Sequence, residues 1–157
     1  MFRVGFGFDT HKLMSEKKLM IGGIHIPCDY GCEGHSDADV LIHAICDALL
    51  GAANMRDIGY HFPDTDMQYT DKKSDFFLKE VCKLIAKEKW KIENIDTTVV
   101  IQQPKLSSYI LSMQEHLASV LQIDTNCISI KAKTSEKIGF IGRKEGISAH
   151  AIALLSK

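Results

Sequence analysis

The sequence predicts an α+β protein, an α/β sandwich in which helices cover one face of a four-stranded mixed sheet, with a small β-hairpin beside it. Two observations predict this class. Strand-like and helix-like patterns alternate along the chain, and a glycine pair divides two short apolar runs near the N-terminus. The 157 residues contain no internal repeat or linker, so we expect one domain over residues 1–157 that buries about two-thirds of its unfolded surface.

The first third of the chain predicts a strand, a hairpin and a helix. Residues 2–9 alternate large apolar with small or polar side chains, which predicts a strand with the large side chains on one face. These large residues are Phe2, Val4, Phe6 and Phe8. In "LMIGGIHIP", the Gly22-Gly23 pair tolerates the positive φ angles of a tight hairpin turn. A helix is expected over residues 37–55, with Ser36 as its N-cap.

The rest of the chain predicts a loop, two more helices and three more strands. Residues 57–71 are acidic and loop-like, with a turn at Pro63-Asp64. Amphipathic patterns then predict helices over residues 74–90 and 108–121. Runs of β-branched and other apolar residues predict strands at 95–103, 127–133 and 147–155.

Composition limits the partners and the compartment. The net charge of −1 gives no reason to expect a nucleic acid or an anionic membrane as partner. No apolar run approaches the roughly 20 residues that cross a bilayer, and the N-terminus lacks the pattern of a signal peptide. The five cysteines include no C-x-x-C pair. We therefore expect a cytoplasmic protein that binds neither nucleic acid nor membrane.

A candidate metal site combines the end of the first strand with the first helix. Asp9 and His11 stand at alternate positions, so their side chains leave an extended segment on the same side. His43 lies on the helix with Asp39 and Asp47 four residues away on either side, and either carboxylate could hold its second ring nitrogen. One carboxylate and two imidazoles suit a catalytic Zn²⁺ with an open fourth position. The alternative is a solvated strand end beside a histidine that pairs with its helical neighbours.

A candidate phosphate site precedes the same helix, in "GHSDAD". The free N–H groups and positive dipole end of a helix N-terminus suit an anion, and His35 and Ser36 could donate to its oxygens. An ordinary helix cap is the alternative for Ser36. A nucleophilic triad of His35, Ser36 and Asp37 is disfavoured, because adjacent residues rarely reach the relay geometry.

Three further stretches carry polar groups that allow more than one interpretation. One loop contains three aspartates, Asp57, Asp64 and Asp66. These carboxylates could be simply solvated, could bind sugar hydroxyls or could ligate a Mg²⁺ ion through oxygen. In "KAKTSEKIGFIGR", hydroxyls with exposed backbone N–H groups could cradle phosphates while Glu136 takes the accompanying cation. Lys105 in "QQPKL" is a point charge suited to phosphate, or a solvated lysine after a turn. The chain contains neither a Walker loop nor a complete dinucleotide fingerprint.

In combination, these stretches resemble a known family. "GFGFDTHKL", "IGGIHIP", "GHSDADVLIHAICDALLGA", "DIGYHFPDTD", "QQPKL" and "KAKTSEKIGFIGRKEGISAHAIALL" follow the order of the 2-C-methyl-D-erythritol 2,4-cyclodiphosphate synthase family over essentially the whole chain. The resemblance implies a homotrimeric lyase of the non-mevalonate isoprenoid pathway, bacterial and cytoplasmic, with active sites between subunits. It implies conversion of 4-diphosphocytidyl-2-C-methyl-D-erythritol 2-phosphate into 2-C-methyl-D-erythritol 2,4-cyclodiphosphate and CMP by intramolecular phosphoryl transfer.

The resemblance also implies the roles of individual residues. Zn²⁺ would bind Asp9, His11 and His43, and Mg²⁺ or Mn²⁺ at Glu136 would bridge the substrate diphosphate. His35 and Thr134 would stabilise the transition state. The implied substrate contacts are Ser36, Asp57, Gly59, Phe62, Pro63, Asp64, Thr65, Asp66, Gln102, Gln103, Pro104, Lys105, Ala132, Lys133, Ser135, Phe140 and Arg143.

Within that set, the family pattern assigns parts of the substrate to segments. Asp57 and Gly59 would hold the ribose, and residues 62–66 the methylerythritol part. Residues 102–105 and 132–134 of a neighbouring subunit would contact the cytidine and its phosphates. Arg143 would lie by a cavity on the threefold axis, where an isoprenoid diphosphate is a candidate ligand.

The sequence departs from the family at two positions and leaves two other functions open. Phe6 stands where the family often has His, away from the ligand pair, and Lys133 replaces a hydroxyl residue near the phosphates. A zinc-dependent phosphohydrolase would use the same metal to activate water. A non-catalytic module would bind a nucleotide or a metal without turnover.

Overall fold

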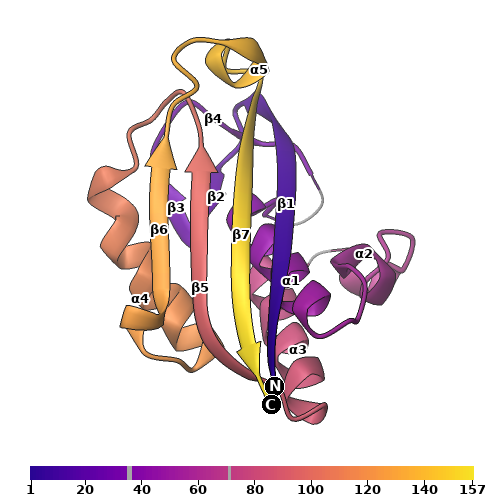
Figure 1. The fold of residues 1–157 in the computed structure, drawn as a ribbon. Helices are drawn as coiled ribbons and strands as arrows, with labels where there is room; N and C mark the ends of the chain where they lie inside the picture. Colours follow the sequence, from indigo (N-terminus) through magenta and orange to yellow (C-terminus); the bar gives the residue numbers. More distant parts are fainter. Residues whose placement is uncertain (35–36, 71) are drawn as a thin grey trace.

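A five-stranded sheet in the order β4-β1-β7-β5-β6 is the frame of the protein (Figure 1). The computed structural model describes residues 1–34, 37–70 and 72–157. β5 and β6 pair in parallel and the other neighbours are antiparallel. The strands are β1 (Phe2–Ser15), β4 (Tyr30–Cys32), β5 (Lys91–Val100), β6 (Ile128–Lys133) and β7 (Gly146–Ser156).

The mixed sheet with helices on one face is as expected, and the sheet has one strand more than the four predicted. β1 continues past Asp9 to Ser15 because β7 pairs with it from Phe2 to Lys12. Its far end then pairs with the short strand β4, which supplies the fifth strand. The lengthened β1 carries both Asp9 and His11 inside regular strand geometry.

The predicted hairpin consists of β2 (Leu19–Ile21) and β3 (Ile24–Ile26), a separate two-stranded sheet. Gly22 and Gly23 take φ angles of 58° and 76°, the left-handed region that the turn requires. The hairpin prediction is therefore confirmed together with its physical reason.

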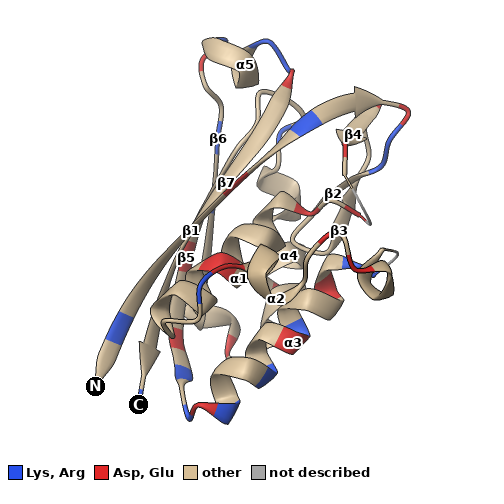
Figure 2. Ribbon diagram, turned by 90° about the vertical axis from the view of Figure 1, so that its right-hand side faces the viewer, with Lys and Arg blue, Asp and Glu red and all other residues tan. Residues whose placement is uncertain are grey.

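The helices α1 and α4 pack on the large sheet, and α3 packs against α1 and α4 on the same side of the molecule (Figure 2). The helices are α1 (Val40–Ala52), α2 (Ile58–His61), α3 (Ser74–Lys87), α4 (Ile110–Leu121) and α5 (Gly139–Gly142). The short helix α2 lies in the segment predicted as a loop, and α5 in the glycine-rich stretch between the last two strands. None of the helices in the described residues is long and apolar enough to cross a membrane.

The first helix starts later than predicted, at Val40, and its N-cap is Asp39. The Asp39 carboxylate accepts hydrogen bonds from the N–H groups of Leu41 and Ile42, at 3.2 and 3.1 Å. The prediction of Ser36 as N-cap is therefore wrong, because Asp39 performs this function.

β1 presents glycine to the helices and phenylalanine to the outside. A Cβ on Gly7 would lie 1.9 Å from the carbonyl oxygen of Ala44, and one on Gly5 equally close to that of Ala48. Only glycine therefore lets α1 pack this closely on the strand. The predicted apolar face is exposed on the opposite side, with relative exposures of 70, 68, 62 and 51% at Phe2, Val4, Phe6 and Phe8.

Candidate metal centre and adjoining pockets

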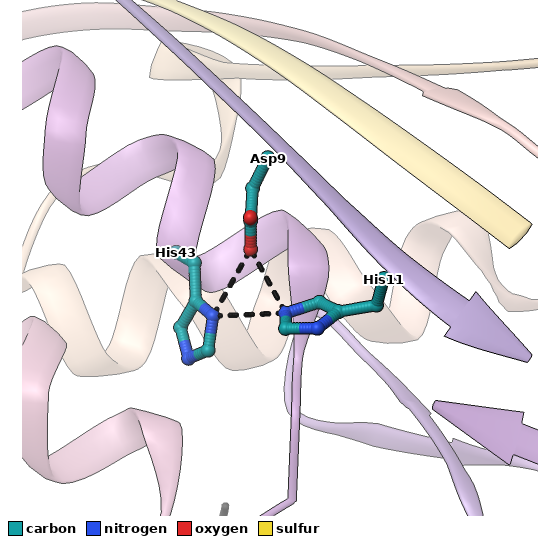
Figure 3. Close-up of side chains that lie close together, drawn as sticks. All are labelled: Asp9, His11 and His43. Carbon is teal, nitrogen blue, oxygen red and sulfur yellow. Dashed lines mark hydrogen bonds and ion pairs between the residues drawn. The ribbon is translucent and has the colours of Figure 1, made fainter. Parts of the chain in front are cut away.

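Asp9, His11 and His43 point toward one another between β1 and α1 (Figure 3). Oδ2 of Asp9 lies 2.9 Å from Nε2 of His11 and 3.1 Å from Nδ1 of His43. The two ring nitrogens are 3.2 Å apart. A tetrahedral ion with bonds of about 2.0–2.1 Å holds its ligand atoms about 3.3 Å from one another. The three side chains can therefore hold one metal ion with little movement.

The backbone of β1 explains why these side chains meet. Asp9 and His11 continue the face of the strand on which Gly5 and Gly7 lie, and that face contacts α1. The close approach that the glycines permit brings the helix, and His43 with it, within reach of both ligands. The two-residue period of a strand predicted that the side chains of Asp9 and His11 leave on the same side, and the structure confirms this.

The electrostatics of the group favour a bound cation. Burial would raise the pKa of the Asp9 carboxyl, but its hydrogen bonds to His11 and His43 hold that pKa well below its usual range. Burial also opposes a charge on His43, yet the hydrogen bond that this imidazole donates to the Asp9 carboxylate raises its pKa overall. Near neutral pH the carboxylate is thus ionised and available as a ligand.

The second ring nitrogen of His43 faces a serine. Nε2 of His43 lies 3.2 Å from Oγ of Ser74, the first residue of α3. The Ser74 hydroxyl donates to the carboxylate of Asp37, which also accepts the Ser74 backbone N–H at 3.1 Å. Asp37 thereby caps α3 from a distance and fixes the serine against the imidazole.

Neither carboxylate predicted as the partner of His43 has that function. Asp39 turns back to cap α1 and to accept the N–H groups of Gly22 and Gly23, at 2.9 and 2.7 Å. Asp47 accepts the N–H of Ile58 at 2.8 Å and so holds the start of α2. The prediction was wrong because each carboxylate accepts hydrogen bonds from backbone N–H groups instead.

A cavity of about 290 Å³ opens at the metal-ligand group. Besides the three ligands it is lined by Gly34, Ile58, Gly59, Phe62, Asp64, Asp66, Tyr69, Thr70 and Phe77. Four residues predicted to bind substrate are therefore brought to the metal group: Gly59, Phe62, Asp64 and Asp66. Asp57, Pro63 and Thr65 belong to the same segment but do not line this cavity.

Tyr69 and Phe77, which line this cavity beside Phe62, were not predicted as site residues. The ring of Phe62 lies 5.4 Å from that of Tyr69 and 5.2 Å from that of Phe77, measured between centroids. Phe77 belongs to the apolar stripe of α3, which the sequence indicated only as a core-facing helix side. The stripe was the available signal, but it did not distinguish a cavity wall from the core.

A second cavity, of about 160 Å³, lies where β5 and β6 end. It is lined by Ile101, Gln102, Pro104, Lys105, Leu106, Ser107, Ala132, Lys133 and Thr134. Six of these were predicted to contact substrate. Gln103 was also predicted but does not line the cavity, and no residue lines both cavities in the described part of the chain.

The segment after β6 carries five predicted site residues: Thr134, Ser135, Glu136, Phe140 and Arg143. Thr134 Oγ1 donates to Oε1 of Glu136 at 2.7 Å, at an exposed position beside the second cavity. The Ser135 hydroxyl donates to the carbonyl of Ile138 at 2.7 Å. Phe140 lies on α5, and Arg143 directly after it pairs with a glutamate. His35 and Ser36 lie outside the described residues.

The fold and the ligand group together define an α+β protein with a candidate metal centre that opens into a cavity of about 290 Å³. The model of the YgbB family matches residues 2–156, so the chain belongs to the YgbB family. A protein from Francisella philomiragia called 2-C-methyl-D-erythritol 2,4-cyclodiphosphate synthase is 54% identical over 157 residues, which cover 99% of each chain. A protein of the same name from Bacteroides thetaiotaomicron is 55% identical over 155 residues, 99% of this chain and 98% of its own.

Solved structures agree with these sequence relatives. The structure described as bifunctional IspDF from Campylobacter jejuni matches 99% of this chain with a TM-score of 0.95 and 39% identity. The present chain spans 42% of the length of that bifunctional protein. A Plasmodium falciparum IspF, described as a CDP complex, matches with a TM-score of 0.87 and 38% identity over 98% of this chain and 95% of its own. The family resemblance predicted from the motifs is confirmed.

Proposed function

We propose that this protein converts 4-diphosphocytidyl-2-C-methyl-D-erythritol 2-phosphate into 2-C-methyl-D-erythritol 2,4-cyclodiphosphate and CMP. The observation that carries the proposal is the convergence of Asp9, His11 and His43 at the cavity, in a chain more than half identical to synthases of this name. Such a reaction belongs to the pathway that forms isoprenoid precursors.

The reaction needs alignment and neutralisation of charge more than covalent help from the protein. An oxygen of the 2-phosphate attacks the β-phosphorus, the bond from that phosphorus to the bridging oxygen breaks, and the electron pair leaves with CMP. The attacking phosphate is already ionised, so no general base is required. Asp9, His11 and His43 would hold Zn²⁺, which supplies positive charge to phosphate oxygens when bound.

The chain's own residues would orient the substrate around that centre. Asp64 and Asp66 in the first cavity suit the hydroxyls of the methylerythritol part, and Asp57 and Gly59 the ribose. His35 and Ser36 are proposed for the phosphates on the family pattern. The second cavity, with Pro104 and Lys105 among its walls, suits the cytidine end.

A second cation is proposed beside Thr134. The Glu136 carboxylate is exposed there and bonded to the Thr134 hydroxyl, so both oxygen groups could face a substrate diphosphate. A hard cation such as Mg²⁺ or Mn²⁺ suits carboxylate and phosphate oxygens. Thr134, with His35, would then stabilise the charge of the transition state, and Ser135 and Lys133 would lie close to the same phosphates.

We infer a homotrimer with active sites at the subunit boundaries. The row of large apolar side chains on the outer face of β1 continues onto β7 at Ile152, which is 47% exposed. Such a row favours burial against other copies of the chain. Among the described residues the two cavities share no lining residue, which supports an active site that takes one cavity from each of two subunits.

Two further assignments rest on the same proposal. Arg143 would lie near the threefold axis, where an isoprenoid diphosphate is the candidate ligand, and Phe140 would contact the substrate. The five cysteines are all free thiols, which supports a cytoplasmic, reducing location for one domain of 157 residues.

The test is turnover by the purified protein with Zn²⁺, Mg²⁺ and the diphosphocytidyl substrate, followed by phosphorus NMR. We expect CMP and the cyclic diphosphate in equal amounts. CMP with an uncyclised bisphosphate would identify a phosphohydrolase, and binding without turnover a non-catalytic module. His43→Ala should lose both zinc and CMP release while staying folded, whereas the control His25→Ala, at an exposed position on β3, should retain both. Full activity of a zinc-free His43→Ala protein would contradict the metal assignment.

A further inference from the structure

The hydroxyl of Tyr30 donates a hydrogen bond to the backbone carbonyl of Gln103 at 2.6 Å. The two residues are 73 positions apart in the sequence. Tyr30 begins the edge strand β4, and Gln103 precedes Pro104 in the wall of the second cavity. A contact of this length is a well-formed O–H···O hydrogen bond, and it joins the edge of the sheet to a loop that lines the cavity.

That loop has little support from its own backbone. In the described part of the chain, residues 102–105 form no backbone-to-backbone hydrogen bond, whereas the N–H of Ile101 still donates to the carbonyl of Lys133 at 3.0 Å. The shape of the loop therefore depends on contacts made with side chains.

Within residues 1–34, 37–70 and 72–157, three such contacts hold the loop, and one of them comes from β4. Lys144 Nζ donates to Oε1 of Gln103 at 2.6 Å, and the N–H of Lys137 donates to Oε1 of Gln102 at 3.1 Å. Both of these donors lie in the exposed segment after β6 and act on side-chain amides. The Tyr30 hydroxyl instead bonds to a backbone carbonyl of the loop, that of Gln103, and so fixes the path of the main chain.

Tyr30 is itself well supported. It pairs with Ser15 at the end of β1, its ring packs against the core, and its carbonyl accepts a hydrogen bond from the Cys28 thiol. Burial, with the nearby Cys28 and Asp29, raises the pKa of the Tyr30 phenol above its usual value. The phenol therefore remains a donor across the physiological pH range.

We propose that Tyr30 is a positioning residue for the pyrimidine-nucleotide pocket and sets the geometry of residues 102–105 for a cytidine nucleotide. The inference rests on the proposed function, because it takes the second cavity as the cytidine site. A cavity walled by Ile101, Pro104 and Leu106 offers apolar contact to a base. The exposed backbone groups of the loop then discriminate the edge of that base, so a shift of the loop weakens nucleotide binding.

The experiment compares Tyr30→Phe with wild type. This change removes only the hydroxyl and keeps the ring that packs on the core. Loss of one hydrogen bond of ordinary strength corresponds to an increase of about three- to tenfold in KM for the diphosphocytidyl substrate and in Kd for CMP. We expect kcat to stay within about twofold, because no residue of this loop is among the described residues that form the metal-ligand group or line its cavity.

The matched control is Tyr109→Phe, the same chemical change at a tyrosine of the 3₁₀ turn before α4. It should leave KM, Kd for CMP and kcat unchanged. Zinc content, the melting temperature and the oligomeric state should be the same in all three proteins. If wild type turns over substrate and Tyr30→Phe has an unchanged KM and CMP affinity, the positioning proposal is overturned and the proposed function stands.

Two other results are equally decisive. A fall in melting temperature with parallel losses in kcat and zinc content would show a purely structural role for Tyr30 and overturn the proposal. A wild-type protein that neither binds CMP nor releases it from the substrate would overturn the proposed function itself.

Discussion

Nε2 of His43 lies 3.2 Å from the hydroxyl of Ser74, while Nδ1 of the same ring faces Asp9 and His11. Each nitrogen of the imidazole thus has its own partner, and the orientation of the ring is set from both sides. A hydrogen-bond partner on the far nitrogen is the usual means of fixing a metal-binding histidine.

Ser74→Ala should weaken zinc binding. The substitution removes the hydroxyl behind His43, and loss of such a partner commonly lowers metal affinity by about 10- to 100-fold. α3 should persist, because Asp37 still accepts the backbone N–H of residue 74. Zinc affinity is measured by competition with a chelating dye. Ser119→Ala, an exposed serine of α4, is the control, and equal affinity in both variants would contradict the role of Ser74.

Zinc affinity should fall as the pH is lowered, and the fall should begin above the pH typical of histidine. Hydrogen bonding to Asp9 raises the pKa of His43, so in the metal-free protein the ring binds a proton more readily than a free imidazole does. A protonated ring cannot be a ligand, hence protons compete with zinc below this raised pKa. Chelator competition at several pH values between about 5.5 and 8 measures the effect. An affinity that does not change over this range would contradict it.

Gly7→Ala should destabilise the protein. The new Cβ would lie 1.9 Å from the carbonyl oxygen of Ala44, so α1 must move away from β1. Overpacking of this kind costs about 1–3 kcal/mol, and the shift should also weaken zinc binding, because His43 moves with the helix. Denaturant unfolding measures the first effect and chelator competition the second.

Gly51→Ala is the matched control for that substitution. The nearest described atom to a Cβ at Gly51 would be the carbonyl oxygen of Phe6, at 3.9 Å, and the residue lies within α1. Alanine is a better helix former than glycine, by about 1 kcal/mol. The control should therefore be as stable as wild type or more so. Equal effects of the two substitutions would contradict the close-packing explanation.

Phe6→Glu should prevent assembly if the outer face of β1 is the interface between subunits. A charge there leaves the monomer fold intact, since Phe6 is 62% exposed, but it cannot be buried against another copy. Light scattering should report a monomer. This monomer should still bind zinc but should release no CMP from the substrate. Leu111→Glu, which places the same charge at an equally exposed position on α4, should remain assembled and active. A fully active Phe6→Glu assembly would refute this interface.

Short-range patterns predicted much of this protein because their causes are local. The period of two along β1 is a property of the extended chain, so it correctly placed Asp9 and His11 on one side. The turn at Gly22-Gly23 follows from the φ angles that glycine allows. The same reasoning failed for Asp39 and Asp47, since helical spacing places two side chains on one face without saying which donors compete for them.

By itself, the sequence determined the α+β class, the family and the three candidate metal ligands. Only the tertiary structure decided that Ser74 stands behind His43, that Phe77 forms a cavity wall and that Tyr30 holds the carbonyl of Gln103. The Ser74–His43 and Tyr30–Gln103 contacts join residues 31 and 73 positions apart in the chain. Such contacts depend on how strands and helices pack against one another, and the residue periodicity within one segment does not predict that packing.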